Sequence, residues 1–285
     1  MSAPVAIRPA LQPVGTPSWT VGAGAWDTHA HVFGEPERYP LRAERLYTPP
    51  MQETDLYLSV LGAVGVEYGV LVQPSVYGQD NSCLLDALDA APSRLVGVVD
   101  VDVLRASDAE LASMHAGAVR GLRVFLRPDV SASELRDRAA CLRELGWHLD
   151  LNVVDADILC ELDLATLGVP VMVEAMGSPH AYGSPGFAVL LDLLRVSDTW
   201  VKLSHAYHLD HDGPPYRRAA RYAREILATA PEKAVWGSDW PHPMGAGVMP
   251  DDASLVDLVL DWADGDRTLA DAVMCTNPTR FYRTP

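Results

Sequence analysis

The sequence has 285 residues, of which 48% are hydrophobic, and its 22 basic and 38 acidic residues give a formal net charge of −16. A chain of this size can bury a large core, and barrels of about 250 residues commonly form one domain. The acidic charge is spread along the chain and repels nucleic-acid phosphates and anionic lipid headgroups. It therefore argues against nucleic-acid and membrane partners.

The cysteines and the amino-terminal segment are typical of a cytoplasmic protein. Cys83, Cys141, Cys160 and Cys275 have no CxxC spacing, so we interpret them as reduced thiols. Residues 1–24 are rich in proline, glycine and alanine, and they lack the basic start and apolar core of a signal peptide. No apolar run approaches the roughly 18–20 residues of a membrane span. We therefore predict an extended amino-terminal arm.

Eight short apolar runs rich in strand-forming residues follow the arm, and helical patterns separate most of them. The runs cover residues 25–30, 67–73, 95–101, 121–125, 147–153, 170–175, 200–204 and 234–238. Capping boxes at Ser107 with Glu110 and at Ser131 with Glu134 begin two of the helices, and Gly146 ends the second. Ser184 followed by proline predicts the start of another helix. That helix is predicted over residues 186–195, and two further helices are predicted over residues 214–230 and 254–263.

Eight strand-then-helix units in one chain favour an α/β fold that closes as a single (β/α)₈ TIM barrel. The structural rival is an open doubly wound sheet, which usually carries a glycine-rich phosphate loop after its first strand. Here the first strand runs into a histidine-rich segment with no such loop. We predict an arm over residues 1–24 and a barrel over residues 25–285.

His29 and His31 stand at the end of the first predicted strand. Side chains two residues apart on a strand point to the same side, here into the barrel. Two such imidazoles can chelate a metal or polarise a substrate oxygen, although polar packing is the alternative. In TIM barrels the active site lies at the carboxyl ends of the strands, which is where this pair falls.

Asp239 stands where the eighth predicted strand opens into a loop. A carboxylate held there by hydrogen-bonding partners can take a proton from an attacking water. The structural alternative is an aspartate that caps the next turn. Because Asp239 and the histidine pair fall at the same end of the predicted barrel, we interpret all three as catalytic.

Ordered stretches from the first strand to the carboxyl end match one family pattern. They are residues 27–34, 39–41, 47–50, 72–78, 80–81, 121–123, 201–204, 236–243 and 277–278. On these residues the chain resembles the amidohydrolase superfamily, in the branch that contains 2-pyrone-4,6-dicarboxylate hydrolase, other lactone hydrolases and galactarolactone isomerase. The coverage makes the resemblance more specific than any single motif.

The resemblance implies hydrolysis of a carboxylated lactone, commonly without a metal. Asp239 would activate water, while His29 and His31 would polarise the lactone carbonyl. Arg123 and Arg127 would bind carboxylates of the substrate, since a planar guanidinium suits two-pronged contacts. Three further residues would line the pocket: Tyr47, Ser75 and Tyr77.

The sixth predicted strand departs from the family pattern. That strand usually ends in Asp-His-Met-Gly, but here Ala175 stands where the histidine is expected. No candidate for a carbamylated lysine appears on the fourth strand, where Arg123 lies. We therefore predict no metal. The alternative is zinc or manganese bound by His29, His31 and Asp239.

The seventh strand also departs from the pattern, because His205 replaces a glycine and His208 falls near an expected arginine. We interpret His205 as restoring the imidazole lost at Ala175, although both histidines could simply be solvated. An imidazole in place of arginine weakens the hold on a second carboxylate. The substrate is then predicted to differ from the pyrone dicarboxylate.

Alternating polar residues mark the fifth predicted strand. Asn152 lies nearest the mouth and is predicted to contact substrate, whereas His148 and Asp150 are predicted to form a structural hydrogen-bonded pair.

The leading hypothesis is therefore a metal-independent hydrolase, or isomerase, of a carboxylated lactone or related cyclic ester. One alternative is a metal-dependent decarboxylase of the same superfamily. Another is a barrel that has lost hydrolysis and acts as a binding or cyclisation template. The partner is a small carboxylated molecule, and the extended arm would suit a homodimer contact.

Overall fold

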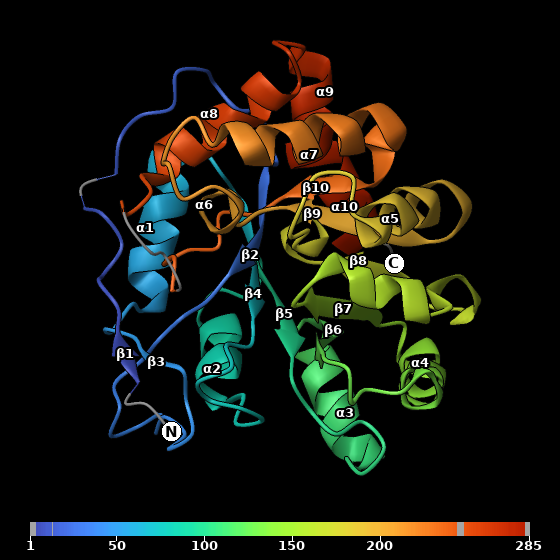
Figure 1. Ribbon diagram of the computed structural model, residues 1–285. Helices are drawn as coiled ribbons and strands as arrows, with labels where there is room; N and C mark the ends of the chain where they lie inside the picture. The colour runs from blue at the N-terminus through green and yellow to red at the C-terminus, as the bar shows by residue number, and fades with distance from the viewer. Residues whose placement is uncertain (1–3, 13, 244–247, 283–285) are drawn as a thin grey trace.

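The computed structural model describes residues 4–12, 14–243 and 248–282. Eight parallel strands pair in the spatial order β10-β9-β8-β7-β6-β5-β4-β2 (Figure 1). In chain order they are β2 (Trp26–Ala30), β4 (Tyr68–Val72), β5 (Leu95–Val99), β6 (Val119–Leu126), β7 (His148–Val153), β8 (Val171–Val173), β9 (Thr199–Leu203) and β10 (Ala234–Trp236). Each overlaps one predicted run, so the strand predictions are confirmed.

The sheet closes on itself just beyond the ends of β2 and β10. Ala30 forms a parallel bridge with Trp240. The backbone nitrogen of His31 donates to the Trp240 carbonyl at 2.7 Å, and that of Asp239 donates to the His29 carbonyl at 2.8 Å. These bonds nearly complete the barrel, which confirms the predicted fold, and they join the two motif-bearing segments at its mouth.

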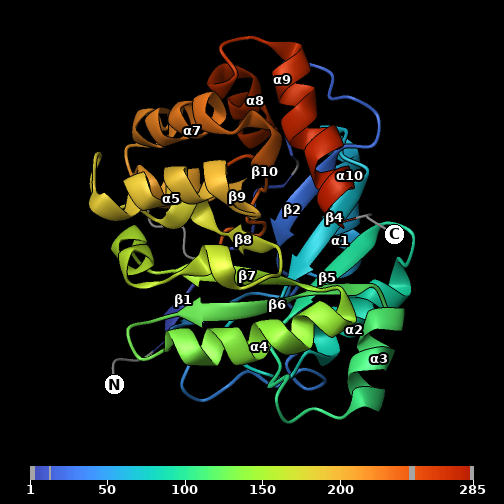
Figure 2. The same cartoon turned by 90° about the vertical axis from the view of Figure 1, so that its right-hand side faces the viewer.

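Helices cover the outside of the barrel, and Figure 2 shows them around the strands from a second side. The main ones are α1 (Thr54–Val64), α2 (Ser82–Ala90), α3 (Asp108–Ala116), α4 (Ala132–Leu145), α5 (Pro185–Val196), α7 (Arg217–Thr229), α8 (Asp252–Trp262), α9 (Arg267–Asp271) and α10 (Asn277–Tyr282). Between β7 and β8 the connection is made by two short 3₁₀ turns, η1 (Ala156–Glu161) and η2 (Leu164–Thr166).

The predicted helix caps are largely present. The Ser107 and Ser131 side chains accept hydrogen bonds from the backbone nitrogens of Glu110 and Glu134, and Gly146 ends α4 with a φ of 67°. That left-handed conformation carries no steric penalty in glycine. Ser184 is the N-cap of α5 with proline at the first helical position, as predicted, although its side chain makes no capping hydrogen bond.

The described part of the arm lies against the outside of the barrel (Figure 1). Its strand β1 (Val5–Ala6) pairs in parallel with β3 (Tyr47–Thr48), which belongs to the loop between β2 and α1. Further along, Gly15 and Ser18 donate backbone hydrogen bonds to Asp251 and Asp257. The arm thus packs on its own chain, and the dimer contact stays a prediction.

Apolar side chains fill the space between strands and helices and also plug the bottom of the barrel, where Trp26 and Met172 are buried with Tyr282 of α10. All four cysteines are unpaired. No helix in the described ranges is long and apolar enough to cross a membrane. Because the interior is filled below, access to the reactive residues is from the mouth.

Candidate active site

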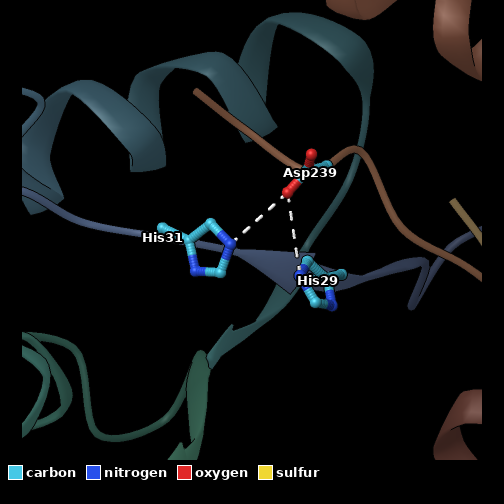
Figure 3. A group of neighbouring side chains, drawn as sticks. All are labelled: His29, His31 and Asp239. Carbon is cyan, nitrogen blue, oxygen red and sulfur yellow. Dashed lines mark ion pairs between the residues drawn. The ribbon is translucent and has the colours of Figure 1, made fainter. Parts of the chain in front are cut away.

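Asp239 lies beside the histidine pair at the mouth of the barrel (Figure 3). Its Oδ1 is 3.4 Å from Nε2 of His31 and 3.7 Å from Nε2 of His29. All three side chains are buried. Asp239 has a φ of 60°, a left-handed conformation that is uncommon in residues other than glycine and clusters at functional sites.

The second oxygen of Asp239 is held from β9 and the segment that follows it. Nε2 of His205 lies 3.2 Å from Oδ2 of Asp239, and the Tyr207 hydroxyl donates a short hydrogen bond to the same oxygen. Burial raises the pKa of Asp239, but the charge and hydrogen bond of His205, with the imidazole of His31 at 3.4 Å, hold that pKa well below its usual range. Asp239 is therefore an ionised carboxylate.

His29 is wedged between Asp239 and a buried lysine. Nζ of Lys202 is 3.2 Å from Nδ1 of His29 and donates to Oδ2 of Asp150 at 2.6 Å. Burial, followed by the charges of Lys202 and of His205, lowers the pKa of His29 well below its ordinary value. The imidazole of His29 is accordingly neutral.

His31 is fixed by a different contact, since its Nδ1 lies 2.7 Å from the carbonyl oxygen of Val72 on β4. A carbonyl only accepts, so Nδ1 carries a proton there. Its Nε2 faces Asp239. The two histidines of the pair are thus held by partners of opposite kind, an ammonium for His29 and a carbonyl for His31.

Arg123 forms a buried ion pair that the sequence did not predict. Its Nη2 donates to Oε2 of Glu174 at 2.7 Å, and its Nη1 donates to the Gln73 carbonyl at 2.7 Å. Asn152 donates to the same Glu174 oxygen at 2.7 Å. The charge of Arg123 is therefore compensated within the barrel before any substrate arrives.

A cavity of about 430 Å³ opens over Asp239. It is lined by most of the residues predicted to bind substrate: Tyr47, Ser75, Arg123, Arg127, Asn152, His205 and His208, together with His31 and Ala175. Two predicted residues are not among the described residues that line it. His29 is fully buried behind Asp239. Tyr77 points elsewhere, and its hydroxyl accepts a hydrogen bond from the Gly34 nitrogen at 3.2 Å.

Of the two histidines after β9, His205 is buried and His208 is partly buried, and both line the cavity. His205 is 8% exposed, and its ring lies 4.8 Å from the ring of His29. Burial, with the nearby charge of His205, lowers the pKa of His208 to about 4, so His208 is neutral at pH 7. Its Nε2 is buried with no hydrogen-bond partner among the described residues.

His148 and Asp150 are neighbours, as predicted, but the shorter contact of Asp150 is with Lys202. Nε2 of His148 is 3.7 Å from Oδ2 of Asp150, whereas Nζ of Lys202 reaches that oxygen at 2.6 Å. The ammonium of Lys202, on β9, displaces the imidazole because a charged donor makes the shorter and stronger bond.

Three residues of the site carried no predicted role. Lys202 lies within the seventh predicted strand, Tyr207 follows it, and Glu174 lies in the sixth predicted run. The available signal was a charged or polar residue inside an otherwise apolar run. Such residues are buried only when they are paired, so each required a partner on another strand.

The residues present fit a divalent metal in donor type. His29, His31 and Asp239 each offer a ligand atom, and these atoms lie within 4.8 Å of one another. Nε2 of His29 and Oδ1 of Asp239 are buried with no hydrogen-bond partner among the described residues. Two imidazoles with a carboxylate form a known zinc donor set. The Lys202 ammonium beside His29 opposes a second positive charge at this point.

Comparisons with known proteins give concordant results. A family model described as "Amidohydrolase" matches residues 26–284. The chain is 34% identical over 275 residues to a 4-sulfomuconolactone hydrolase from Hydrogenophaga intermedia, covering 91% of this chain and 88% of the relative. It is 33% identical over 284 residues to a 2-pyrone-4,6-dicarboxylate hydrolase from Comamonas testosteroni, covering 93% and 92%. A crystal structure from Agrobacterium tumefaciens superposes with a TM-score of 0.81 at 24% identity, covering 94% and 99%.

Proposed function

Because the chain belongs to the amidohydrolase family, we propose that it hydrolyses a carboxylated lactone or a related cyclic ester. The observation that carries this proposal is the buried, ionised carboxylate of Asp239 at the floor of a mouth cavity. It faces two imidazoles, and its Oδ1 has no hydrogen-bond partner among the described residues. Such an oxygen can accept the proton of an attacking water.

In the proposed reaction the water oxygen bonds to the lactone carbonyl carbon while Asp239 takes the proton. His31 and His205 line the cavity beside Asp239 and polarise the carbonyl oxygen as it gains negative charge. The ring carbon–oxygen bond then breaks, and the leaving oxygen takes the proton from Asp239. The product is the ring-opened hydroxy acid, which contains the atoms of the lactone and of one water. His29, which does not reach the cavity, acts on Asp239 instead of on the carbonyl.

The acid group of the substrate is bound, in this proposal, by Arg127, an exposed guanidinium in the cavity lining. Arg123 contributes less than the sequence suggested, because Glu174 already compensates its charge. His208 is neutral where the family has an arginine. These three features favour a substrate with one principal anionic group over a dicarboxylate.

We propose that the reaction needs no metal, since the ammonium of Lys202 lies 3.2 Å from His29, one of the three possible ligands, and opposes a second cation there. If zinc or manganese binds, the residues that would hold it are His29, His31 and Asp239. The ion would supply Lewis acidity there. A stoichiometric metal needed for activity would bring forward the decarboxylase alternative. The four free thiols support a cytoplasmic location.

The test is an activity screen of the purified protein on a panel of carboxylated and sulfonated lactones, with and without chelator, together with elemental analysis. Ring opening that survives the chelator is expected, and conversion of one lactone into an isomeric one would indicate an isomerase instead. Asp239→Asn is expected to lower kcat by at least about 1,000-fold, as removal of a catalytic base does. Asp192→Asn, on the exposed face of α5, is the matched control.

If Asp239→Asn turns over lactone at the rate of the Asp192→Asn control, Asp239 is not the base and the mechanism is wrong. If neither variant nor the unaltered protein opens any lactone but the protein binds one tightly, the binding or cyclisation template is the better explanation.

A further inference from the structure

Lysine is rare in this chain, and one lysine lies in the least favourable place for a charge. Lys202 and Lys233 are the two lysines of the sequence, so the other twenty of its 22 basic residues are arginines. The side chain of Lys202 is fully buried inside the barrel. Burying an ammonium is unfavourable unless it is paired, so a buried lysine requires a specific partner.

The contacts of Lys202 form a column that ends at the catalytic carboxylate. Nζ of Lys202 lies 2.6 Å from Oδ2 of Asp150 and 3.2 Å from Nδ1 of His29. Nε2 on the far side of the same imidazole lies 3.7 Å from Oδ1 of Asp239. The order along the column is therefore carboxylate, ammonium, imidazole, carboxylate.

An ammonium has three donors and no lone pair. Nδ1 of His29 lies 3.2 Å from this donor and 3.9 Å from Oε1 of Glu174, so the nearer lysine makes Nδ1 the accepting, unprotonated nitrogen. The single ring proton then lies on Nε2, which faces Asp239. Asp150 fixes this arrangement because its Oδ2 accepts a hydrogen bond from Nζ of Lys202 at 2.6 Å and holds the side chain in place.

We propose that Lys202 is a positioning residue that acts through His29: it fixes the ring proton of His29 on Nε2, so that this N–H is directed at Oδ1 of the catalytic Asp239. The inference rests on the proposed function for its catalytic meaning. It also bears on metal binding, because Nε2 of His29 cannot ligate a metal while it carries the proton.

The first test reads the tautomer and needs no substrate. Histidine labelled with ¹⁵N gives signals from nine residues, and His29 is assigned by the signal lost in His29→Gln. In the unaltered protein His29 is expected to be neutral with the proton on Nε2. A proton on Nδ1, or on both nitrogens, overturns the proposal whether or not any lactone is hydrolysed.

The second test replaces both charged groups beneath His29 with uncharged side chains. Lys202→Met with Asp150→Asn avoids leaving an unpaired buried charge, and it is expected to shift the His29 proton toward Nδ1. We expect kcat to fall by about 10- to 100-fold with little change in KM, as when an outer partner of a catalytic group is lost. Lys202→Arg, which keeps a donor-only group, is expected to restore the tautomer and part of the rate.

A matched control and a background variant separate positioning from packing. Lys233→Met removes the other lysine, whose Nζ donates to the Leu194 and Ser197 carbonyls away from the site, and both rate and tautomer should persist. In His29→Gln, whose amide replaces Nε2 but lacks Nδ1, the Lys202→Met/Asp150→Asn pair should cost no more than about threefold in kcat. An unchanged cost in that background shows that Lys202 acts through packing and overturns the proposal.

Discussion

Charged side chains are paired in the barrel interior, whereas several at the rim of its mouth are not. Inside, Lys202 is matched by Asp150 and Arg123 by Glu174, and all four side chains are at most 5% exposed. Each buried cation has one carboxylate at hydrogen-bond distance. A buried charge without a partner would destabilise the fold, so these pairs are fixed structural parts of the site.

The rim keeps an excess of positive charge. Apart from Arg123 and Asp239, the cavity lining contains three arginines and one acid, a net charge of +2 from these side chains, in a chain whose net charge is −16. The guanidinium of Arg127 makes no hydrogen bond or ion pair within the described ranges, and that of Arg42 has a loose ion pair with Glu44 at 3.7 Å. The interior charges therefore hold the groups around Asp239 in place, whereas the charges at the rim remain available to an anionic substrate.

The largest effect should come from breaking an interior pair. Glu174→Gln leaves Arg123 buried without a counter-charge, and we expect the free energy of unfolding to fall by about 3–5 kcal/mol. Urea unfolding followed by circular dichroism measures it. The control is Asp86→Asn, which breaks the exposed pair with Arg38 and should cost no more than about 1 kcal/mol. Equal losses in the two variants would contradict the distinction between interior and rim.

The interior pair around Asp150 should also give a pH dependence. Burial raises the pKa of Asp150, but the charge of Lys202 and the contact with His148 lower it below its ordinary value; Arg123 and Tyr282 also face it. A depressed folded-state pKa means that the ionised form stabilises the fold above about pH 4 and that this contribution is lost as the pH falls further.

We therefore expect the unfolding free energy of the unaltered protein, minus that of Lys202→Met/Asp150→Asn, to decrease below about pH 4. Urea unfolding at neutral and acidic pH measures this difference. A difference that stays constant or grows on acidification would show that Asp150 is not held ionised by the fold.

The interior is also where prediction from sequence stopped. The eight strands, and the meeting of His29, His31 and Asp239, followed from strand patterns and from the rule that barrel strands end at one mouth. The pairing of Arg123 with Glu174 did not, because it depends on side-chain reach across neighbouring strands. A pattern gives the strand and the face of a residue but not which of several buried partners it contacts.

At the rim, Arg127→Ala should raise KM for a carboxylated lactone by about 10-fold, since one charge-assisted contact is lost, and should change kcat little. Steady-state kinetics at two salt concentrations measures this, because added salt should reduce the difference. The control is Arg105→Ala, at an exposed arginine that pairs with Asp102. A fall in kcat with unchanged KM would place Arg127 in the chemistry instead of in binding.

The smallest expected effect concerns how the rim is held. Arg45 and Tyr47 of the cavity lining belong to one loop. This loop pairs with β1 of the arm, where the Val5 nitrogen donates to the Leu46 carbonyl at 3.0 Å. Val5→Pro removes that donor, so the loop becomes less ordered and KM should rise by about two- to threefold. The control is Leu11→Pro, at an arm position outside β1. Because Val5 and Leu46 are exposed, kcat and the unfolding free energy should hardly change; a large loss of either would mean that the arm supports the barrel itself.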